Sequence, residues 1–175
     1  MFLRLFHWST AEIGTALGLV LVTFVGSGSV FGTWWVSRPS VAGNSPFIMT
    51  TMRNALLMVL CMSPLAGWAT SAPIALAAIA IIIFGAAMVS GLAAIALFQV
   101  TPNFFRGQVI AANILSGSLL GMGVGLTLVA AVSDHVFHDE LAIGKALAMV
   151  IGAAAALGAY SVHRASSHAE LNLEW

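Results

Sequence analysis

Four long stretches of this sequence contain no charged side chain, and that pattern most constrains how the chain can fold. The longest of them runs from Asn54 to Phe105, 52 residues without Asp, Glu, Lys or Arg. A helix rises about 1.5 Å per residue and the hydrocarbon core of a bilayer is about 30 Å thick, so about 20 apolar residues cross it once. The stretch is therefore long enough for two membrane crossings joined by a turn.

The composition excludes most classes of soluble protein. Of the 175 residues, 60% are hydrophobic and 7% are charged, with a formal net charge of zero. Soluble domains carry about 25% charged residues because their surfaces face water. A chain without excess positive charge has no basic surface for a nucleic acid, and the single Cys61 excludes a disulfide framework. We expect an all-α integral membrane protein whose surroundings are the lipid bilayer.

Five transmembrane helices fit the distribution of charges. The turn within the longest uncharged stretch is predicted at Gly67–Pro73, where small and polar residues accompany an interfacial Trp and a helix-starting Pro. Barrel strands are excluded because the apolar runs are too long and do not alternate. The predicted spans lie at roughly 13–36, 48–68, 73–99, 108–132 and 142–163, within a bundle of residues 1–165 followed by a tail of residues 166–175.

The distribution of Lys and Arg predicts the orientation of these spans. Cytoplasmic loops carry the excess of basic residues. Five alternating spans place Arg4 and Lys145 on one side of the membrane, and Arg38, Arg53, Arg106 and Arg164 on the other. We therefore expect the N-terminus outside and the C-terminus in the cytoplasm.

The ionisable residues do not form a pattern typical of an enzyme. The segment Asp134–Glu140 contains two His and three acidic residues, a combination that can ligate a metal, although a solvated loop between two spans is the favoured interpretation. The predicted spans contain no general base, and the sequence has no phosphate-binding GxxxxGK[ST] motif. We expect no enzymatic activity, no cofactor and no metal site.

Polar residues within the spans are the candidates for contact with a solute. Thr23 and Ser27 share a helical face, as do Asn113 and Ser116, and Ser90 lies in the third span. For the hydroxyl residues, a hydrogen bond to the residue's own helix is the favoured interpretation. Asn113 is the better candidate, because an amide in a membrane must face protein or a water-filled cavity.

Glycines spaced four residues apart occur in the first and fourth spans. The first span contains two such pairs, Gly14 with Gly18 and Gly28 with Gly32. The fourth contains Gly117, Gly121 and Gly125 on one helical face. Small residues at this spacing let membrane helices pack closely. Close packing is the favoured interpretation, and helices that rock past each other in a transporter are the alternative.

Two segments at the ends of spans resemble signatures of the major facilitator superfamily. Gly32–Arg38 is similar to its G-G-x-x-A-D-R loop. Thr101–Gln108 is similar to the T-P-N-x-x-R-G-Q turn that opens the eleventh helix in the spinster-like bacterial branch. Trp8–Gly14 and Gly121–Phe137 are similar to that branch in the same order. The motif positions carried by this chain are Gly32, Arg38, Thr101, Pro102, Asn103, Arg106 and Gly107.

This resemblance implies that the five spans correspond to helices eight to twelve of such a transporter. The chain departs from the pattern at Ser37, where Asp is usual, and at Ser118, where Asn is common. The first seven helices have no counterpart in it. The implied function is that of a C-terminal part of a secondary active transporter, which moves a small organic solute by alternating access. A split gene with a separately encoded N-terminal half, a truncated gene and a misplaced start codon are the alternatives for the half that is missing.

A second function from a different class stays open at this point. The chain would then be a non-transporting membrane protein that packs against partner helices. Apart from Arg53 and Lys145, which lie toward the ends of their spans, the spans contain no acidic or basic residue that could carry a coupling proton, so in the transporter interpretation coupling belongs to the other half.

Overall fold

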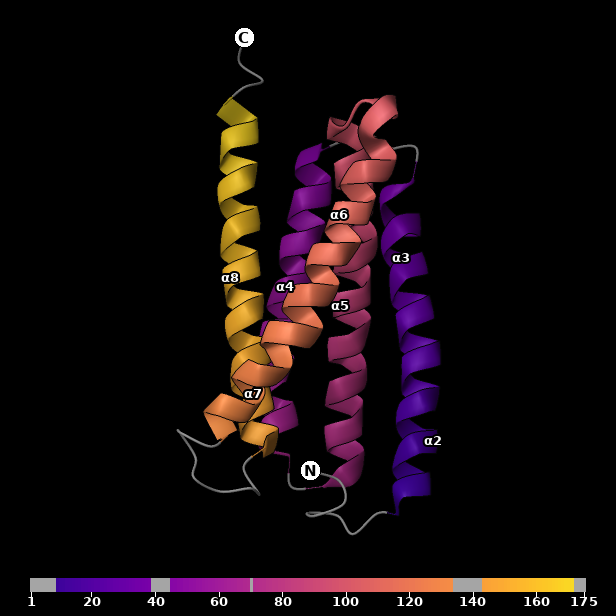
Figure 1. Ribbon diagram of the computed structural model, residues 1–175, viewed down its shortest axis with the longest axis vertical. Helices are drawn as coiled ribbons and strands as arrows, with labels where there is room; N and C mark the ends of the chain where they lie inside the picture. Colours follow the sequence, from indigo (N-terminus) through magenta and orange to yellow (C-terminus); the bar gives the residue numbers. More distant parts are fainter. Residues whose placement is uncertain (1–8, 39–44, 70, 134–142, 172–175) are drawn as a thin grey trace.

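The structure, a computed structural model, describes residues 9–38, 45–69, 71–133 and 143–171. All regular secondary structure in these ranges is helical (Figure 1). Five helices are long and apolar enough to cross a membrane, which confirms the prediction of an all-α, five-span architecture of the membrane type. These spans are Ala11–Val36, Pro46–Gly67, Ala72–Gln99, Asn103–Val132 and Gly144–Ser166.

The first span is one continuous helix with a wider turn in its middle. It consists of α2 (Thr10–Val20), a π-helical segment η1 (Leu21–Val25) and α3 (Gly26–Val36). Ser9 caps its start, where the Ser9 hydroxyl accepts a hydrogen bond from the Glu12 amide and the Glu12 carboxylate accepts one from the Ser9 amide. This reciprocal capping satisfies two helix-end donors and fixes where the span begins.

The second and third spans form the predicted hairpin. Helix α4 (Ser45–Gly67) ends where the Trp68 amide donates to the Pro64 carbonyl oxygen at 3.0 Å. Helix α5 (Ala72–Val100) then begins after Ser71, which has an extended backbone, with a Pro in its first turn. A Pro there costs no hydrogen bond, because the first amides of a helix have no intrahelical partner. The predicted turn between the two spans is confirmed.

The fourth and fifth spans extend beyond their predicted limits. The fourth starts with a short 3-10 turn η2 (Asn103–Phe105) and continues as α6 (Arg106–Ser118), a π-helical segment η3 (Leu119–Gly125) and α7 (Leu126–Val132). Helix α8 (Ile143–Leu171) continues into the segment expected to form the tail. Up to Leu171 that segment contains Ser, His, Ala, Glu and Leu but neither Gly nor Pro, so no helix-breaking residue ends the helix there.

Four of the five spans pack side by side in the order α3, α5, α4 and α8 (Figure 1). Buried side chains of α4, α5 and α8 form the largest cluster, which includes Val59, Ile82 and Ala155. A second cluster joins α3, α4 and α5 around Ile48 and Leu92, two side chains that are almost completely buried. Because many of the buried residues are Ala, the helix backbones lie close together.

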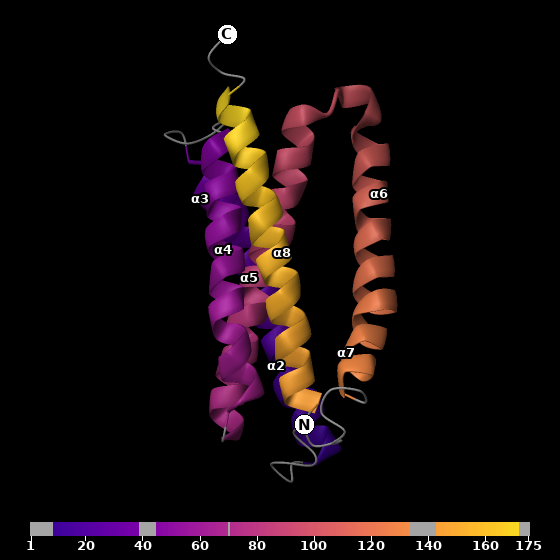
Figure 2. The same ribbon diagram turned by 90° about the vertical axis from the view of Figure 1, so that its left-hand side faces the viewer.

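The fourth span stands apart from this layer (Figure 2). It contacts α5 through the turn at its start and α8 through α7 at its end. None of the residues in its most apolar window is buried inside the chain, whereas 28% to 39% are buried in the second, third and fifth spans. The described residues therefore leave most of both long sides of this helix uncovered by protein.

Close contact between α3 and α5 depends on two glycines of the first span. A Cβ atom at Gly28 would lie 2.5 Å from the backbone oxygen of Phe84 on α5, and one at Gly32 would lie 2.8 Å from the Met88 side chain. Side chains of any size at these positions would push the helices apart. The predicted packing role of the first-span glycines is confirmed at this pair.

Arginines gather at one end of the bundle. This is the end where α3 and α5 finish and where α4 and α6 begin, and Lys145 lies at the opposite end on α8 (Figure 1). The asymmetry that the alternating spans predict is present in the fold. The assignment of this end to the cytoplasm stays a prediction. The arginines at this end are Arg38, Arg53, Arg106 and Arg164.

Candidate functional site

The predicted solute contacts lie on three separate spans, the first, third and fourth, and do not line a common cavity among the described residues. All five side chains are exposed in the chain taken alone. The Thr23 hydroxyl donates to the Leu19 carbonyl oxygen at 2.6 Å, and the Ser116 hydroxyl donates to the Asn113 carbonyl oxygen at 3.0 Å. For these two hydroxyls, the expected hydrogen bond to their own helix is confirmed. The five candidates are Thr23, Ser27, Ser90, Asn113 and Ser116.

Asn113 is the candidate whose chemistry demands another partner. Its side chain is exposed on α6, and its amide makes no hydrogen bond with the residues that the structure describes. An unpaired amide in hydrocarbon costs several kcal/mol, roughly 2–7 by the usual transfer scales. In a membrane this face of α6 therefore requires either water or further polar protein groups.

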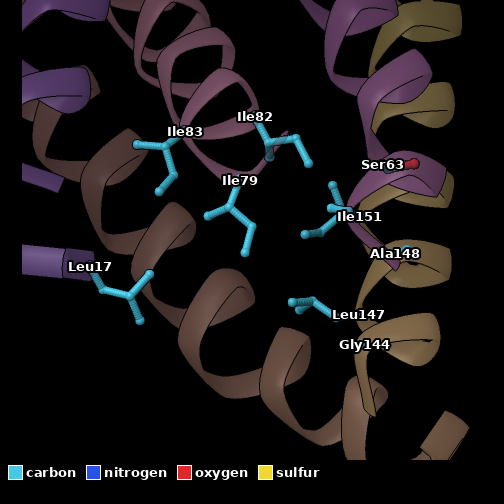
Figure 3. Close-up of a pocket in the computed structure, with 10 residues that line it drawn as sticks. Leu17, Ser63, Ile79, Ile82, Ile83, Gly144, Leu147, Ala148 and Ile151 are labelled. Carbon is cyan, nitrogen blue, oxygen red and sulfur yellow. The ribbon is translucent and has the colours of Figure 1, made fainter. Parts of the chain in front are cut away.

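An apolar cavity of about 370 Å³ lies between α2, α4, α5 and α8 (Figure 3). Ile79, Ile82 and Ile83 of α5 and Ile151 of α8 form much of its wall, and Leu17 of α2 approaches from the other side. The cavity has no ionisable side chain, so it suits hydrocarbon rather than a charged solute.

The cavity contains one polar side chain, Ser63, which is buried. The Ser63 hydroxyl donates to the Leu60 carbonyl oxygen at 3.1 Å, so it needs no partner from the cavity.

Of the predicted solute contacts, Ser90 shares a face of α5 with Ile79 and Ile83, at spacings of eleven and seven residues. Ser90 is therefore the one that lies in line with the cavity wall.

A second hollow of about 410 Å³ was not predicted from the sequence. It lies between α3, α4 and α5, with the rings of Phe31, Trp35 and Phe84 on one side. Polar atoms come from α4, where Asn54 and neighbouring Thr residues line it. The signal that could have revealed it is the placement of Thr50, Thr51 and Asn54 at spacings of three and four residues on one helical face.

The first loop motif combines a packed glycine with a cation beside aromatic rings. Gly32 is buried against α5, as described above. The Arg38 guanidinium lies 4.3 Å from the ring centre of Trp34 and 4.5 Å from that of Trp35. Such contacts hold a cation over apolar surface at the end of a helix. The Ser37 hydroxyl donates to the Thr33 carbonyl oxygen, so Ser37 stabilises the helix end rather than supplying the usual acidic charge.

The second loop motif forms a tight turn between α5 and α6. Pro102 follows the end of α5 at Val100, and the Phe105 amide donates back to the Pro102 carbonyl oxygen at 3.0 Å. The Arg106 Nε donates to the Thr101 carbonyl oxygen at 3.2 Å. Arg106 thus meets a carbonyl oxygen at the C-terminus of α5. Asn103 lies in the 3-10 turn, and a Cβ at Gly107 would meet no atom within 4 Å.

The glycine row of the fourth span is not in contact with another described helix. A Cβ atom at Gly117 or Gly121 would meet nothing within 4 Å, and one at Gly125 would meet only the Leu120 carbonyl oxygen of its own helix, at 3.6 Å. The row therefore packs against no other element in the described part of this chain. Packing against a partner stays a prediction.

The expected loop cluster Asp134–Glu140 lies outside the described residues. Among the residues that the structure describes, no group of three His, Cys, Asp or Glu side chains could hold a metal ion. Comparison of the chain with protein-family models, curated proteins and solved structures finds no match. The functional conclusion therefore rests on the chain's own residues and geometry.

Proposed function

We propose that the chain is the C-terminal part of a secondary active transporter of the major facilitator type, which moves a small organic solute across the bacterial inner membrane by alternating access. The single observation that carries this proposal is the uncovered fourth span. It crosses the membrane region with Asn113 unpaired and with its glycine row facing open space. A helix of this kind needs a water-filled path, another bundle, or both beside it.

The turn at the start of that span adds support from sequence. Its Thr101–Gln108 segment resembles the turn of the spinster-like branch. Within this turn, Arg106 donates a hydrogen bond to the Thr101 carbonyl oxygen at the end of α5. On this proposal the helices of an N-terminal half form the opposite wall of the solute path. The solute that passes the spans of this chain is uncharged where it touches them, because the candidate contacts are hydroxyls and an amide.

Uptake into proteoliposomes tests the proposal. The chain is reconstituted alone and together with an N-terminal half, taken from the neighbouring gene or from a transporter with the same turn. We expect counterflow of one member of a panel of neutral sugars, nucleosides and amphiphiles only when both parts are present. Asn113→Leu should abolish that counterflow without preventing assembly, whereas the matched variant Leu115→Ile should not change it.

A non-transporting protein that packs against partner helices is the second candidate, and the same uncovered span favours it. The glycine row Gly117, Gly121 and Gly125 would then be a contact surface for one other helix. Stable assembly with the N-terminal half, no counterflow for any solute and loss of assembly in Gly121→Leu would favour this candidate over the transporter.

A further inference from the structure

Helices α4 and α8 run antiparallel and pack closely along most of their lengths. A Cβ atom at Gly152 would lie 2.9 Å from the Ser63 hydroxyl oxygen, and one at Gly158 would lie 3.3 Å from the Leu56 side chain. These contacts fix the register of the two helices. One helical turn beyond the Gly158–Leu56 contact, toward the arginine-rich end, the first part of α4 lies beside the last third of α8.

A hollow of about 350 Å³ opens between the two helices at that level. Arg53 and Leu57 line it from α4, and Ala159, Tyr160 and His163 line it from α8. Arg53 is half-buried, whereas Tyr160 and His163 are exposed. The hollow therefore combines a guanidinium, a phenol and an imidazole above a short aliphatic wall.

The hollow lies toward the arginine-rich end of the apolar length of both helices. Between Lys145 and His163, α8 has 18 residue steps, or about 27 Å of helix, which is close to the thickness of a hydrocarbon core. On α4, Arg53 lies seven residues inside the span Pro46–Gly67, and no charged residue follows it before Gly67. A long basic side chain near the end of a span extends its charged group toward the headgroup region, so Arg53 lies within reach of lipid headgroups at the end where His163 also lies.

The Arg53 guanidinium has no carboxylate beside it in the described part of the chain. Arg53 makes no ion pair with a side chain in the described part of the chain, and no carboxylate lines the hollow. A half-buried guanidinium is stabilised by an anion, and it binds phosphate oxygens through two parallel hydrogen bonds. Basic pockets between transmembrane helices bind anionic lipid headgroups for this reason.

We propose that Arg53, Tyr160 and His163 form a binding site for the phosphodiester group of an anionic phospholipid, with Leu57 and Ala159 against the first carbons of its acyl chains. The Arg53 guanidinium donates to the phosphate oxygens, and the Tyr160 hydroxyl and a ring N–H of His163 donate from the other helix. The lipid joins α4 to α8 at the arginine-rich end of the bundle. This site is separate from the uncovered face of the fourth span.

Native mass spectrometry of the purified full chain tests this proposal with phosphatidylglycerol, phosphatidylcholine and glycerol 3-phosphate as probes. We expect phosphatidylglycerol to remain bound where phosphatidylcholine does not. Arg53→Gln should weaken phosphatidylglycerol binding about five-fold or more, the effect of one basic side chain at an anionic membrane surface. Arg164→Gln is the matched control, because Arg164 follows His163 in sequence but does not line the hollow.

Three results would overturn the proposal. Equal losses in Arg53→Gln and Arg164→Gln would indicate diffuse attraction to a charged surface instead of a site. Equal binding of the two phospholipids would show that the headgroup charge is not recognised. Displacement of phosphatidylglycerol by glycerol 3-phosphate at the same concentration would indicate a site for a soluble phosphate.

Exposed residues keep the proposal testable if Arg53→Gln does not fold. Tyr160→Phe and His163→Leu each remove the hydrogen-bond donor of an exposed side chain, so both should fold as the parent chain does. Each should reduce phosphatidylglycerol binding while leaving helicity by circular dichroism unchanged. Unchanged phosphatidylglycerol binding in both variants would overturn the proposal.

Discussion

Replacement of Gly28 by Ala should force α3 and α5 apart. The added Cβ would lie 2.5 Å from the Phe84 carbonyl oxygen and 3.1 Å from the Ala87 Cβ. A relaxed carbon–oxygen contact is about 3.3–3.6 Å, so the helices must separate by roughly 1 Å at this level. The obstructing atom belongs to the backbone of α5, and no side-chain rotation can move it away.

The size of the effect follows from two opposing contributions. Overpacking of a closely fitted contact costs about 1–3 kcal/mol, and Ala is favoured over Gly within a helix by about 1 kcal/mol. Gly28→Ala should therefore lower the free energy of unfolding by up to about 2 kcal/mol. Gly18→Ala is the matched control in the same span, because a Cβ there would meet nothing within 4 Å. It should leave the free energy of unfolding unchanged or raise it slightly.

Unfolding of the purified chain in detergent micelles measures this difference. Circular dichroism during titration with sodium dodecyl sulfate gives the free energy of unfolding for the parent chain and both variants. Gly28→Ala should unfold at a lower fraction of dodecyl sulfate than Gly18→Ala. If the two variants unfold together, α3 and α5 are not in the close contact described above, and the reasoning from the Gly28 geometry is refuted.

Three further changes have defined outcomes. Arg106→Ala removes the hydrogen bond to the Thr101 carbonyl oxygen and should lower the free energy of unfolding by about 1 kcal/mol. Arg164→Ala is the control and should not change the free energy of unfolding. Equal values for the two variants would show that Arg106 contributes only its charge to the orientation of the spans. A fluorescent protein fused to the C-terminus should fluoresce in the cytoplasm, and alkaline phosphatase inserted after Ser133 should be active; an inactive phosphatase would contradict the orientation. Gly121→Leu should leave the unfolding of the isolated chain unchanged, because the row is uncovered, and it should impair assembly with the N-terminal half or transport by the complex; normal results in both assays would make the row incidental.

Charge placement and turn chemistry were sufficient to locate the spans. Twelve charged residues at the ends of apolar runs leave few ways to cross a bilayer, and each span was found within a few residues of its predicted place. The hairpin after Gly67 and the end of α5 before Pro102 follow from local residues alone. The extension of α8 to Leu171 was not predicted because hydropathy ends at the membrane surface, whereas helix propensity does not.

Contacts between the helices could not be predicted in the same way. The glycine pair Gly28 and Gly32 and the row at Gly121 have the same spacing, yet the first is packed against α5 and the second is uncovered. The difference depends on how each helix is rotated about its axis. An apolar helix such as α5 carries no polar stripe that would reveal this rotation from its sequence.

The candidate site shows the same limit. Asn113 was singled out because an amide in lipid has an unavoidable cost, and that argument needs no tertiary structure. Asn54 was missed because it follows Arg53 at the edge of a span, where a polar residue is unremarkable in sequence. Its place beside the rings of Phe31 and Phe84 depends on the packing of three helices.

On the proposed function, the uncovered face of the fourth span, which carries Asn113, lines an aqueous solute path. Cysteine accessibility tests it most directly, in a background where Cys61 is replaced by Ser. Asn113→Cys is compared with Leu115→Cys, which lies about 200° further round the helix, in membranes that contain both parts of the transporter. We expect a membrane-impermeant maleimide to modify Asn113→Cys rapidly and Leu115→Cys only slightly. Protection of both positions, or equal modification of both, would contradict it.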